Sequence, residues 1–391
     1  MVAPRASQRS TRMSAFEVMD IVSAARERDR AGVSPATCHL EVGQPSAPAP
    51  APVLDAAREA LGGPLGYSDA IGTAELRDAI SRFYSQRYGV AVGSERIAVT
   101  SGASAGFVLL LLAMCDPGDR VAVFEPGYPC YANIADALGV EVTTIHLDAS
   151  TSYRPTVELL DAAVRGPLNA LIVASPSNPT GTALDEAALA ELGSWCSAND
   201  TTLVVDEIYH GTSTTRLTTA AAGTDAVVVQ SFSKYFCMTG WRLGWMVLPN
   251  SLVRSVERLS QNLYLSPNAL SQSAAVAAFG ATDELDSHAG SYAANRSVLI
   301  DALVSAGVAD IAPADGAFYV WADLGGWGES STLCNAWLGD IGVAATPGTD
   351  FDSQRGGRFV RFSVAGDGAE ITEAAQRLGE WLGAHGDRAA S

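Results

Sequence analysis

Lysine is almost absent from this sequence of 391 residues. Of the 25 residues that are lysine or arginine, all except Lys234 are arginine. A guanidinium stays charged throughout the accessible pH range, whereas a desolvated ammonium can lose its proton and then act as a base or form a Schiff base. Lys234 is therefore a candidate for covalent chemistry, unless a bias towards arginine has left one lysine by chance.

Long apolar segments are also absent. The longest apolar run, residues 107–115, is much shorter than the stretch of about 20 residues that a transmembrane helix needs. The formal net charge is −18, which repels anionic membranes and nucleic acids. We therefore expect a soluble, cytoplasmic protein whose partners include neither a membrane nor a nucleic acid.

Cysteine pairs with metal-site spacing are missing as well. The sequence has no Cys-x-x-Cys pair and no histidine cluster, and its six cysteines are scattered as Cys38, Cys115, Cys130, Cys196, Cys237 and Cys334. This pattern argues against a zinc site or a disulfide framework. We expect no bound metal, and most of the thiols are expected to be small buried side chains.

The first residues lack acidic side chains and a hydrophobic signal core. Residues 1–12 are basic and serine-rich, a composition that shares some features with transit peptides. A flexible tail is the simpler interpretation. Met13 remains an alternative start of the chain.

Short β-branched runs are present throughout the first two thirds of the chain, and each is followed by polar or aromatic side chains. Residues 226–231 form one such run, which predicts a buried strand with Ser231, Ser233 and Lys234 at its carboxyl end. Similar runs precede residues 102–104, Tyr128, Asn178, Asp206 and Tyr209. Because ligands of open α/β sheets bind at the carboxyl ends of strands, we expect these residues to gather at one edge.

The alternation of strands and helices predicts the fold class. Between residues 46 and 280 it indicates an α/β unit with a mostly parallel sheet and helices on both faces. A long connecting helix is expected at residues 291–306, followed by short strands at 314–320 and 342–348 and a half-exposed strand at 357–364. We predict a large domain of residues 46–283 and a smaller α+β domain built from residues 1–45 and 284–391.

The residues around Lys234 also match a known pattern. Ser231, Ser233, Lys234, Arg242 and Gly244 follow the spacing S-x-S-K-(x7)-R-x-G, which resembles the lysine-box signature of fold-type I aminotransferases. These are pyridoxal-phosphate enzymes of the aspartate aminotransferase superfamily. Other motifs of the family occur in the expected order, from Gly43 through Y-x(4)-G-x(3)-L-R at Tyr67, N-P-T-G at Asn178 and V-R-(hydrophobic)-S at Arg361.

The resemblance implies a role for each matching residue. Lys234 would carry pyridoxal 5'-phosphate as a Schiff base, Asp206 would keep the ring nitrogen protonated, and Tyr128 would stack on the ring. Asn178 and Tyr209 would bind the phenolic oxygen of the cofactor. The phosphate would be held by Gly102, Ala103, Ser104, Ser231, Ser233 and Arg242.

Two further implications concern the substrate and the partner chain. The backbone of Gly43, together with Asn178 and Arg361, would bind the substrate α-carboxylate, with Arg361 forming a bidentate pair. The protein would be a homodimer in which Tyr67 reaches the cofactor phosphate of the other subunit.

Each of these residues also has an ordinary interpretation when it is taken alone. Tyr67 and Tyr128 are consistent with loop aromatics that pack on a core. Asn178 suits a simple Asn-Pro turn, and Asp206 suits the cap of a following helix. Arg361 is consistent with a surface strand arginine.

The predicted reaction is transamination between an L-amino acid and a 2-oxo acid. A dicarboxylate donor needs a second buried cation, and an aspartate-preferring bacterial branch of the family has a lysine where this chain has Ser104. We therefore expect a neutral donor such as alanine or valine, with aspartate:2-oxoglutarate transamination as the alternative. A C–S β-lyase or a decarboxylase of the same fold would share the cofactor residues. A non-catalytic, cofactor-sensing regulator with a DNA-binding domain is disfavoured, because only a short segment precedes Gly43 and the chain as a whole is acidic.

Overall fold

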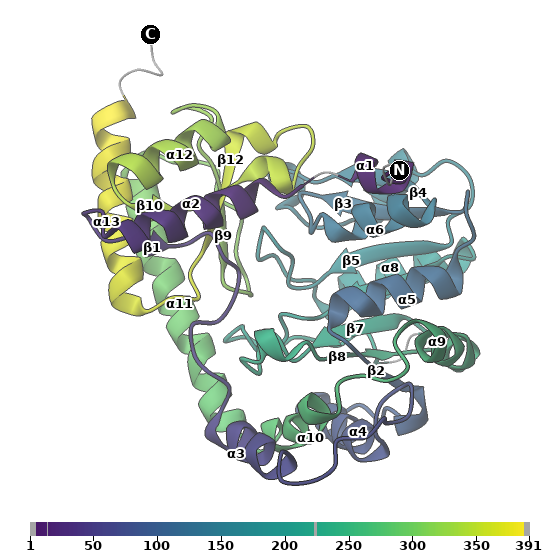
Figure 1. Ribbon diagram of the computed structural model, residues 1–391. Coiled ribbons are helices and arrows are strands. Elements are labelled where there is room, and N and C mark those ends of the chain that lie inside the picture. The colour runs from purple at the N-terminus through teal and green to yellow at the C-terminus, as the bar shows by residue number, and fades with distance from the viewer. Residues whose placement is uncertain (1–4, 14, 223–224, 387–391) are drawn as a thin grey trace.

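A seven-stranded sheet forms the centre of the molecule in the computed structural model, which describes residues 5–13, 15–222 and 225–386 (Figure 1). Its strands lie in the order β2-β8-β7-β6-β5-β3-β4. Neighbouring strands run parallel except at β8, which is antiparallel to both β2 and β7. The strands are β2 (Ile97–Thr100), β3 (Arg120–Glu125), β4 (Glu141–His146), β5 (Ala170–Ala174), β6 (Thr202–Asp206), β7 (Val227–Ser231) and β8 (Gly244–Val247). The predicted, mostly parallel α/β sheet is confirmed.

Helices cover both faces of this sheet. Successive side chains of a strand point to opposite faces, so Val204 and Val205 belong to different hydrophobic clusters. One face is covered by α3 (Ala51–Ala60), α4 (Ala74–Tyr88), α7 (Val157–Ala163), α8 (Glu186–Ala198) and α10 (Ala269–Ala278). The other face is covered by α5 (Ala103–Met114), α6 (Cys130–Leu138) and α9 (Asn250–Leu263).

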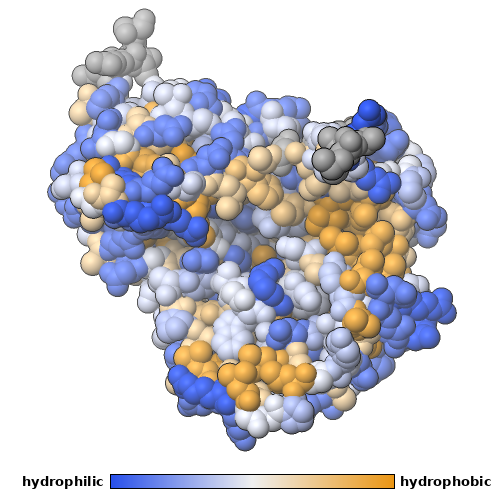
Figure 2. All heavy atoms as spheres, in the orientation of Figure 1, coloured by the Kyte–Doolittle hydropathy of each residue, from blue (hydrophilic) through white to orange (hydrophobic). Residues whose placement is uncertain are grey.

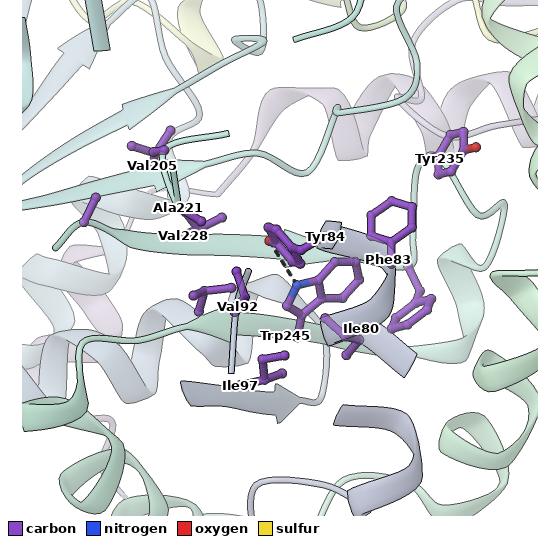
Figure 3. Packing of buried hydrophobic residues seen from close by; sticks show 14 of the residues in the cluster. Ile80, Phe83, Tyr84, Val92, Ile97, Val205, Ala221, Val228, Tyr235 and Trp245 are labelled. Atoms are coloured by element: carbon purple, nitrogen blue, oxygen red, sulfur yellow. Dashed lines mark hydrogen bonds between the residues drawn. The ribbon is translucent and has the colours of Figure 1, made fainter. Parts of the chain in front are cut away.

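Trp245 lies in the first of these clusters and is completely buried (Figure 3). Its indole Nε1 donates a hydrogen bond to the hydroxyl of Tyr84 at 3.3 Å, and the ring of Phe232 lies 4.9 Å from it. Burial of a large apolar side chain stabilises a fold by roughly 1.5–3 kcal/mol. This packing fixes β8 and β7, and β7 leads directly into the segment that carries Lys234.

A second unit contains strands from both ends of the chain (Figure 1). β11 (Thr346–Pro347), β12 (Phe359–Ser363) and β9 (Tyr319–Asp323) form an antiparallel sheet, and β1 (Cys38–His39) pairs in parallel with β10 (Val343–Ala344). The helices are α2 (Glu17–Ala31), α11 (Thr282–Ser305), α12 (Ser330–Asp340) and α13 (Gly368–His385). None of the described helices is long and apolar enough to span a membrane. The exact domain boundary at residues 283 and 284 stays a prediction, because α11 runs through it without a break.

The strand predicted at 357–364 differs from the prediction in its burial. All five residues of β12 are buried, not half exposed. One face of β12 packs into the core of the second unit through Val360 and Phe362, and on the other face Arg361 donates to Asn178, so neither face reaches solvent. The polar alternation of Arg361 and Ser363 marks an internal site, and the sequence pattern was wrong in indicating an outer face.

Several element ends also differ from the sequence expectation. The connecting helix begins at Thr282 rather than at residue 291, and the strand expected at 314–320 begins at Tyr319. In the N-terminal tail, Gln8–Arg12 forms the short helix α1, which Ser7 caps, where a flexible segment was expected. Residues 1–4 of that tail lie outside the described residues.

Candidate active site

A cavity of about 260 Å³ lies between the carboxyl edge of the large sheet and strands β9 and β12. In Figure 2 the middle of the molecule is hollowed between its upper and lower parts. Of the predicted site residues, all except Gly102 and Tyr67 line the cavity: Gly43, Ala103, Ser104, Tyr128, Asn178, Asp206, Tyr209, Ser231, Ser233, Lys234, Arg242 and Arg361. Residues separated by as many as 318 positions in the sequence are therefore brought to one place.

Lys234 follows β7 and points its amine into this cavity. The amine donates a hydrogen bond to the carbonyl oxygen of Gly43. Desolvation, with a smaller contribution from the positive charges of Arg361 and Arg242, lowers the pKa of Lys234 from 10.5 to about 8, and Asp206 opposes this shift. A lysine that loses its proton this readily suits nucleophilic and general-base chemistry.

Asp206 is the last residue of β6 and is 2% exposed. Its Oδ2 accepts a hydrogen bond from the hydroxyl of Tyr131 at 2.5 Å, and its Oδ1 accepts one from the backbone N–H of Ile208 at 3.0 Å. Burial raises the pKa of Asp206 to about 6, and these two hydrogen bonds and Lys234 oppose the increase. At neutral pH the cavity therefore holds a carboxylate that is mostly ionised.

Donors to an anion gather at the amino end of α5. Ala103 and Ser104 form the first turn of this helix, where backbone N–H groups lack helical partners. The hydroxyl of Ser231 accepts a hydrogen bond from the backbone N–H of Ser233 at 3.0 Å, and Arg242 adds a guanidinium. Asp206 is the one acidic residue among the described residues that line the cavity, so a phosphate at this end meets donors and positive charge.

Gly102 lies behind this donor set, although it does not line the cavity. Its φ is +85°, and a Cβ atom placed there would lie 2.6 Å from Nη2 of Arg242. Only glycine combines this backbone conformation with the close approach of the guanidinium. The glycine therefore lets Arg242 reach the helix end, and a phosphate group fits the resulting cradle.

Arg361 on β12 is a buried cation, 6% exposed, whose described neighbours include no paired carboxylate. Its Nη1 donates to Oδ1 of Asn178 at 3.0 Å, and its Nη2 donates to the carbonyl of Glu41 and the hydroxyl of Thr346 at 2.7 and 3.1 Å. Its Nε has no hydrogen-bond partner. A buried cation without a counterion is costly, so this guanidinium suits an anionic ligand.

Tyr319 closes the cavity beside Gly43. Its hydroxyl forms a 2.7 Å hydrogen bond with that of Tyr209, and its ring centroid lies 4.7 Å from the guanidinium carbon of Arg361. A Cβ atom at Gly43 would lie 2.0 Å from the Tyr319 hydroxyl. The glycine predicted from the sequence is therefore required by the tyrosine that faces it.

The sequence analysis missed six lining residues. They are Phe107, Tyr131, Ala174, Ile208, Thr239 and Tyr319. The signal for Tyr131 was its position three residues after Tyr128, which places both on one side of a helix start. Tyr319 had a weaker signal, since only the pairing of β9 with β12 brings it close to Arg361.

Tyr67 lies outside the cavity, with 85% of its surface exposed. Its predicted contact with a second subunit stays a prediction.

A further group of possible metal ligands, Glu125, His146 and Asp352, also lies outside the cavity, with one donor atom from each residue within 4.8 Å of the others. Nε of Arg355 lies 3.5 Å from Oδ2 of Asp352. Asp352 therefore already has a positively charged partner.

The comparisons with known proteins agree with this geometry. Residues 37–378 match the family model described as aminotransferase class I and II. The valine–pyruvate aminotransferase of Mycobacterium tuberculosis is 49% identical over 375 residues, which cover 94% of this chain and 96% of that protein.

Two solved structures show the same likeness across almost the whole chain. The crystal structure of an aminotransferase from Mycobacterium tuberculosis has a TM-score of 0.93 at 47% identity and covers 98% of this chain and 100% of that one. The aspartate aminotransferase of Thermus thermophilus with maleate has a TM-score of 0.90 at 28% identity, with coverages of 97% and 100%. The chain therefore belongs to the class I and II aminotransferases of the aspartate aminotransferase superfamily, which use pyridoxal 5'-phosphate to transfer an amino group between an amino acid and a 2-oxo acid.

Proposed function

We propose that this enzyme transfers the amino group of a neutral amino acid, with valine as the preferred donor and alanine as a second one, to a small 2-oxo acid such as pyruvate. The observation that carries the proposal is the set of cations in the cavity. Within the described chain, the basic residues that line it are Lys234, Arg242 and Arg361. Each has a task, so none is left to pair with a carboxylate on the donor side chain.

The three tasks follow from where the cations lie. Arg242 faces the donors at the amino end of α5, which suit the cofactor phosphate. Lys234 has the reactive amine. Arg361 lies at the far side, held by Asn178, and it suits the α-carboxylate that every amino-acid donor has.

The other lining residues add no positive charge. Phe107, Tyr128, Ile208 and Tyr319 supply aromatic and aliphatic surface beside the reactive groups. An apolar donor side chain is compatible with such walls, whereas an ionised one would lose its hydration without gaining a partner. The name of the relative from Mycobacterium tuberculosis also includes valine and pyruvate.

The residues that would hold the cofactor fit its chemical groups. Tyr128 would stack on the pyridine ring, Asn178 and Tyr209 would bind its phenolic oxygen, and Asp206 would face its nitrogen. The helix end at Ser104 would receive the phosphate. When bound, pyridoxal 5'-phosphate supplies an electron sink that allows an amino acid to lose its Cα proton.

The protein's own groups then hold the substrate and move the proton. Arg361 fixes the α-carboxylate, which orients the Cα–H bond towards Lys234. With a pKa near 8, the amine of Lys234 would take the Cα proton and return it at C4′ of the cofactor, the carbon on the other side of the amino nitrogen. Asp206 keeps a negative charge in the buried end of the site throughout.

We also propose that the active form is a homodimer in the cytoplasm. Tyr67 is exposed, and exposed apolar residues occur at the carboxyl ends of α3 and α9 and in the loops that follow them: Leu61, Leu65, Leu263 and Leu265. Figure 2 shows apolar residues at the lower end of the molecule, where α3 and α10 lie in Figure 1. The free state of all six cysteines suits a reducing compartment.

A test of the dimer mixes a variant of Tyr67 with chains that lack Lys234. Tyr67→Phe should weaken cofactor retention, because a hydroxyl from the second subunit would be lost from each phosphate. Mixing this variant with Lys234→Ala chains should change the activity per site, because subunits are shared. Activities that add as if the chains were monomers would contradict the shared site.

The substrate is tested by an activity matrix on the purified enzyme with added cofactor. Valine, alanine and aspartate are tested as donors, each against pyruvate and 2-oxoglutarate. We expect valine with pyruvate to give the highest kcat/KM. A kcat/KM for aspartate about tenfold above that for valine, roughly 1.4 kcal/mol in transition-state binding, would overturn the proposal. Release of ammonia and pyruvate from a sulfur-containing donor would instead indicate a β-lyase.

A further inference from the structure

Tyr131 contacts the active site from a helix that the sequence motifs do not include. It is the second residue of α6 and is 5% exposed. Its hydroxyl donates to Oδ2 of Asp206 at 2.5 Å, across a sequence separation of 75 residues. This distance is typical of an O–H···O⁻ bond to an ionised carboxylate.

The ring of Tyr131 is held on two sides by aromatic neighbours. The ring of Phe107 lies 4.8 Å from it, and the ring of Tyr128 lies 5.5 Å from it in an edge-on arrangement. The backbone N–H of Tyr131 also donates to the carbonyl of Tyr128 at 3.4 Å. The hydroxyl therefore has a fixed direction, and that direction is towards Asp206.

Asp206 receives two hydrogen bonds and no direct ion pair in the described chain. Tyr131 binds one carboxylate oxygen, and the backbone N–H of Ile208 binds the other. The titratable groups that face the pair from the surrounding elements are Lys234, Glu207, Tyr128 and Tyr209. Lys234 alone among them favours a negative charge at Asp206, so the tyrosine hydroxyl is a main source of its stabilisation.

We propose that Tyr131 is a positioning residue, which aims the carboxylate of Asp206 at the cofactor nitrogen and keeps it negatively charged. The proposal rests on the proposed role of Asp206. Burial alone favours the neutral carboxyl group, and the hydrogen bond opposes it. Burial also raises the pKa of Tyr131 itself far above its usual range, so its hydroxyl remains a donor at every working pH.

Tyr131→Phe removes the hydroxyl and keeps the ring. Loss of a hydrogen bond to a charged group costs about 1.5–3 kcal/mol, so we expect kcat to fall about 10- to 100-fold. The KM values for valine and pyruvate should stay within about twofold of the wild-type values, because Tyr131 does not contact Arg361. A loss of folded enzyme would lower the apparent kcat in the same way, so each rate is divided by the concentration of folded, cofactor-loaded enzyme.

Two readouts do not depend on activity. In the holoenzyme, the pH titration of the visible absorption should differ between Tyr131→Phe and the wild type, because the charge beside the ring nitrogen changes. The affinity for pyridoxal 5'-phosphate, measured by quenching of protein fluorescence, should fall in the variant. The loss should be greater at pH 6 than at pH 8, because Asp206 takes up its proton at a higher pH without the hydroxyl.

Tyr153→Phe is the matched control. Tyr153 is buried at 2% exposure, and its hydroxyl also donates to a carboxylate, Oδ2 of Asp310 at 2.8 Å, but it does not line the cavity. This variant should retain the wild-type kcat, titration and cofactor affinity. Thermal unfolding of both variants shows whether each is folded.

Asp206→Asn distinguishes a failure of the role assigned to Asp206 from a failure of the role assigned to Tyr131. If Asp206→Asn remains fully active, the role assigned to Asp206 is wrong. If Asp206→Asn is inactive while Tyr131→Phe has the kcat, titration and cofactor affinity of the wild type, the role assigned to Tyr131 alone is overturned. Equal losses of kcat and cofactor affinity in Tyr131→Phe and Tyr153→Phe would also overturn the role assigned to Tyr131.

Discussion

Phe351 places the centre of its ring 4.6 Å from the guanidinium carbon of Arg361. This contact is unusual for a buried arginine, because the more common partner of such a charge is a carboxylate. Aromatic faces attract a cation without neutralising it. Arg361 is thereby held in place while its positive charge stays available to an anionic ligand.

Phe351→Leu should raise the KM of every amino-acid donor and leave kcat almost unchanged. A cation–π contact contributes about 0.5–2 kcal/mol, which corresponds to a rise of roughly 2- to 30-fold. Steady-state kinetics with valine and alanine measure this rise in KM. Phe279→Leu, a partly buried aromatic far from any described cation contact, is the control and should change neither KM. A rise confined to one donor would indicate side-chain recognition instead.

Arg361→Ala should weaken the binding of every amino-acid donor more than Phe351→Leu does. Truncating one partner of a buried, hydrogen-bonded charge pair costs about 2–5 kcal/mol. The control is Arg358→Ala on the neighbouring turn, whose side chain is 60% exposed and pairs with Asp323 at 2.8 Å. kcat/KM should be close to wild type in Arg358→Ala and greatly reduced in Arg361→Ala. Similar effects in both variants would contradict the assignment of the carboxylate site to Arg361.

Much of the sheet could be predicted because its signal is local. The run that became β7 is buried on both faces and begins with three consecutive valines, so the strand was visible without any partner. The cofactor residues were then named through their motifs, and the structure brings all of them except Gly102 and Tyr67 to the lining of one cavity.

The missed contacts depend on packing between distant elements. Tyr209 meets Tyr319 across 110 residues, and nothing near either residue in the sequence specifies that pairing. The burial of β12 was missed for the same reason. Contacts with residues distant in the sequence, such as that of Arg361 with Asn178, cover the face that was expected to be exposed.

The single lysine makes the covalent link easy to test. Borohydride reduction of the holoenzyme should leave a pyridoxyl group on Lys234, and Lys234→Arg should lose the visible absorption of the bound cofactor because a guanidinium does not form the bond. Mass mapping of the peptides identifies the modified residue. Arg254→Lys, which adds an exposed second lysine, is the control and should gain no label there. Near wild-type activity in Lys234→Arg would refute the assignment.

The lowered pKa of Lys234 predicts a pH dependence in the cofactor-free protein. The rate of trinitrophenylation of Lys234 by trinitrobenzenesulfonate should rise with pH and reach half of its maximum near pH 8. Arg361→Gln should move this midpoint upward, because it removes the largest of the positive charges that lower it. The added lysine of Arg254→Lys should titrate at the ordinary value, about 10.4.

The same shift has a consequence for stability. Between pH 8 and 10.5 the unfolded chain binds a proton at Lys234 that the folded protein has released, so this residue makes the cofactor-free protein more stable as the pH rises through that window. Urea unfolding of the wild type and Lys234→Met at pH 7.5 and 9.5 measures the difference. A contribution that falls with pH would be inconsistent with the lowered pKa.

Gly102→Ala should reduce the affinity for the cofactor with little effect on the donor KM. The new Cβ would lie 2.6 Å from Nη2 of Arg242 and would sit on a backbone with φ of +85°, so the guanidinium must move away from the helix end where the phosphate would bind. The control is Gly290→Ala in α11, where a Cβ meets nothing within 4 Å. Fluorescence titration of the cofactor-free proteins should show weaker binding in Gly102→Ala alone. If inorganic phosphate competes with the cofactor equally well in Gly102→Ala and the wild type, Arg242 does not act on the phosphate through this cradle.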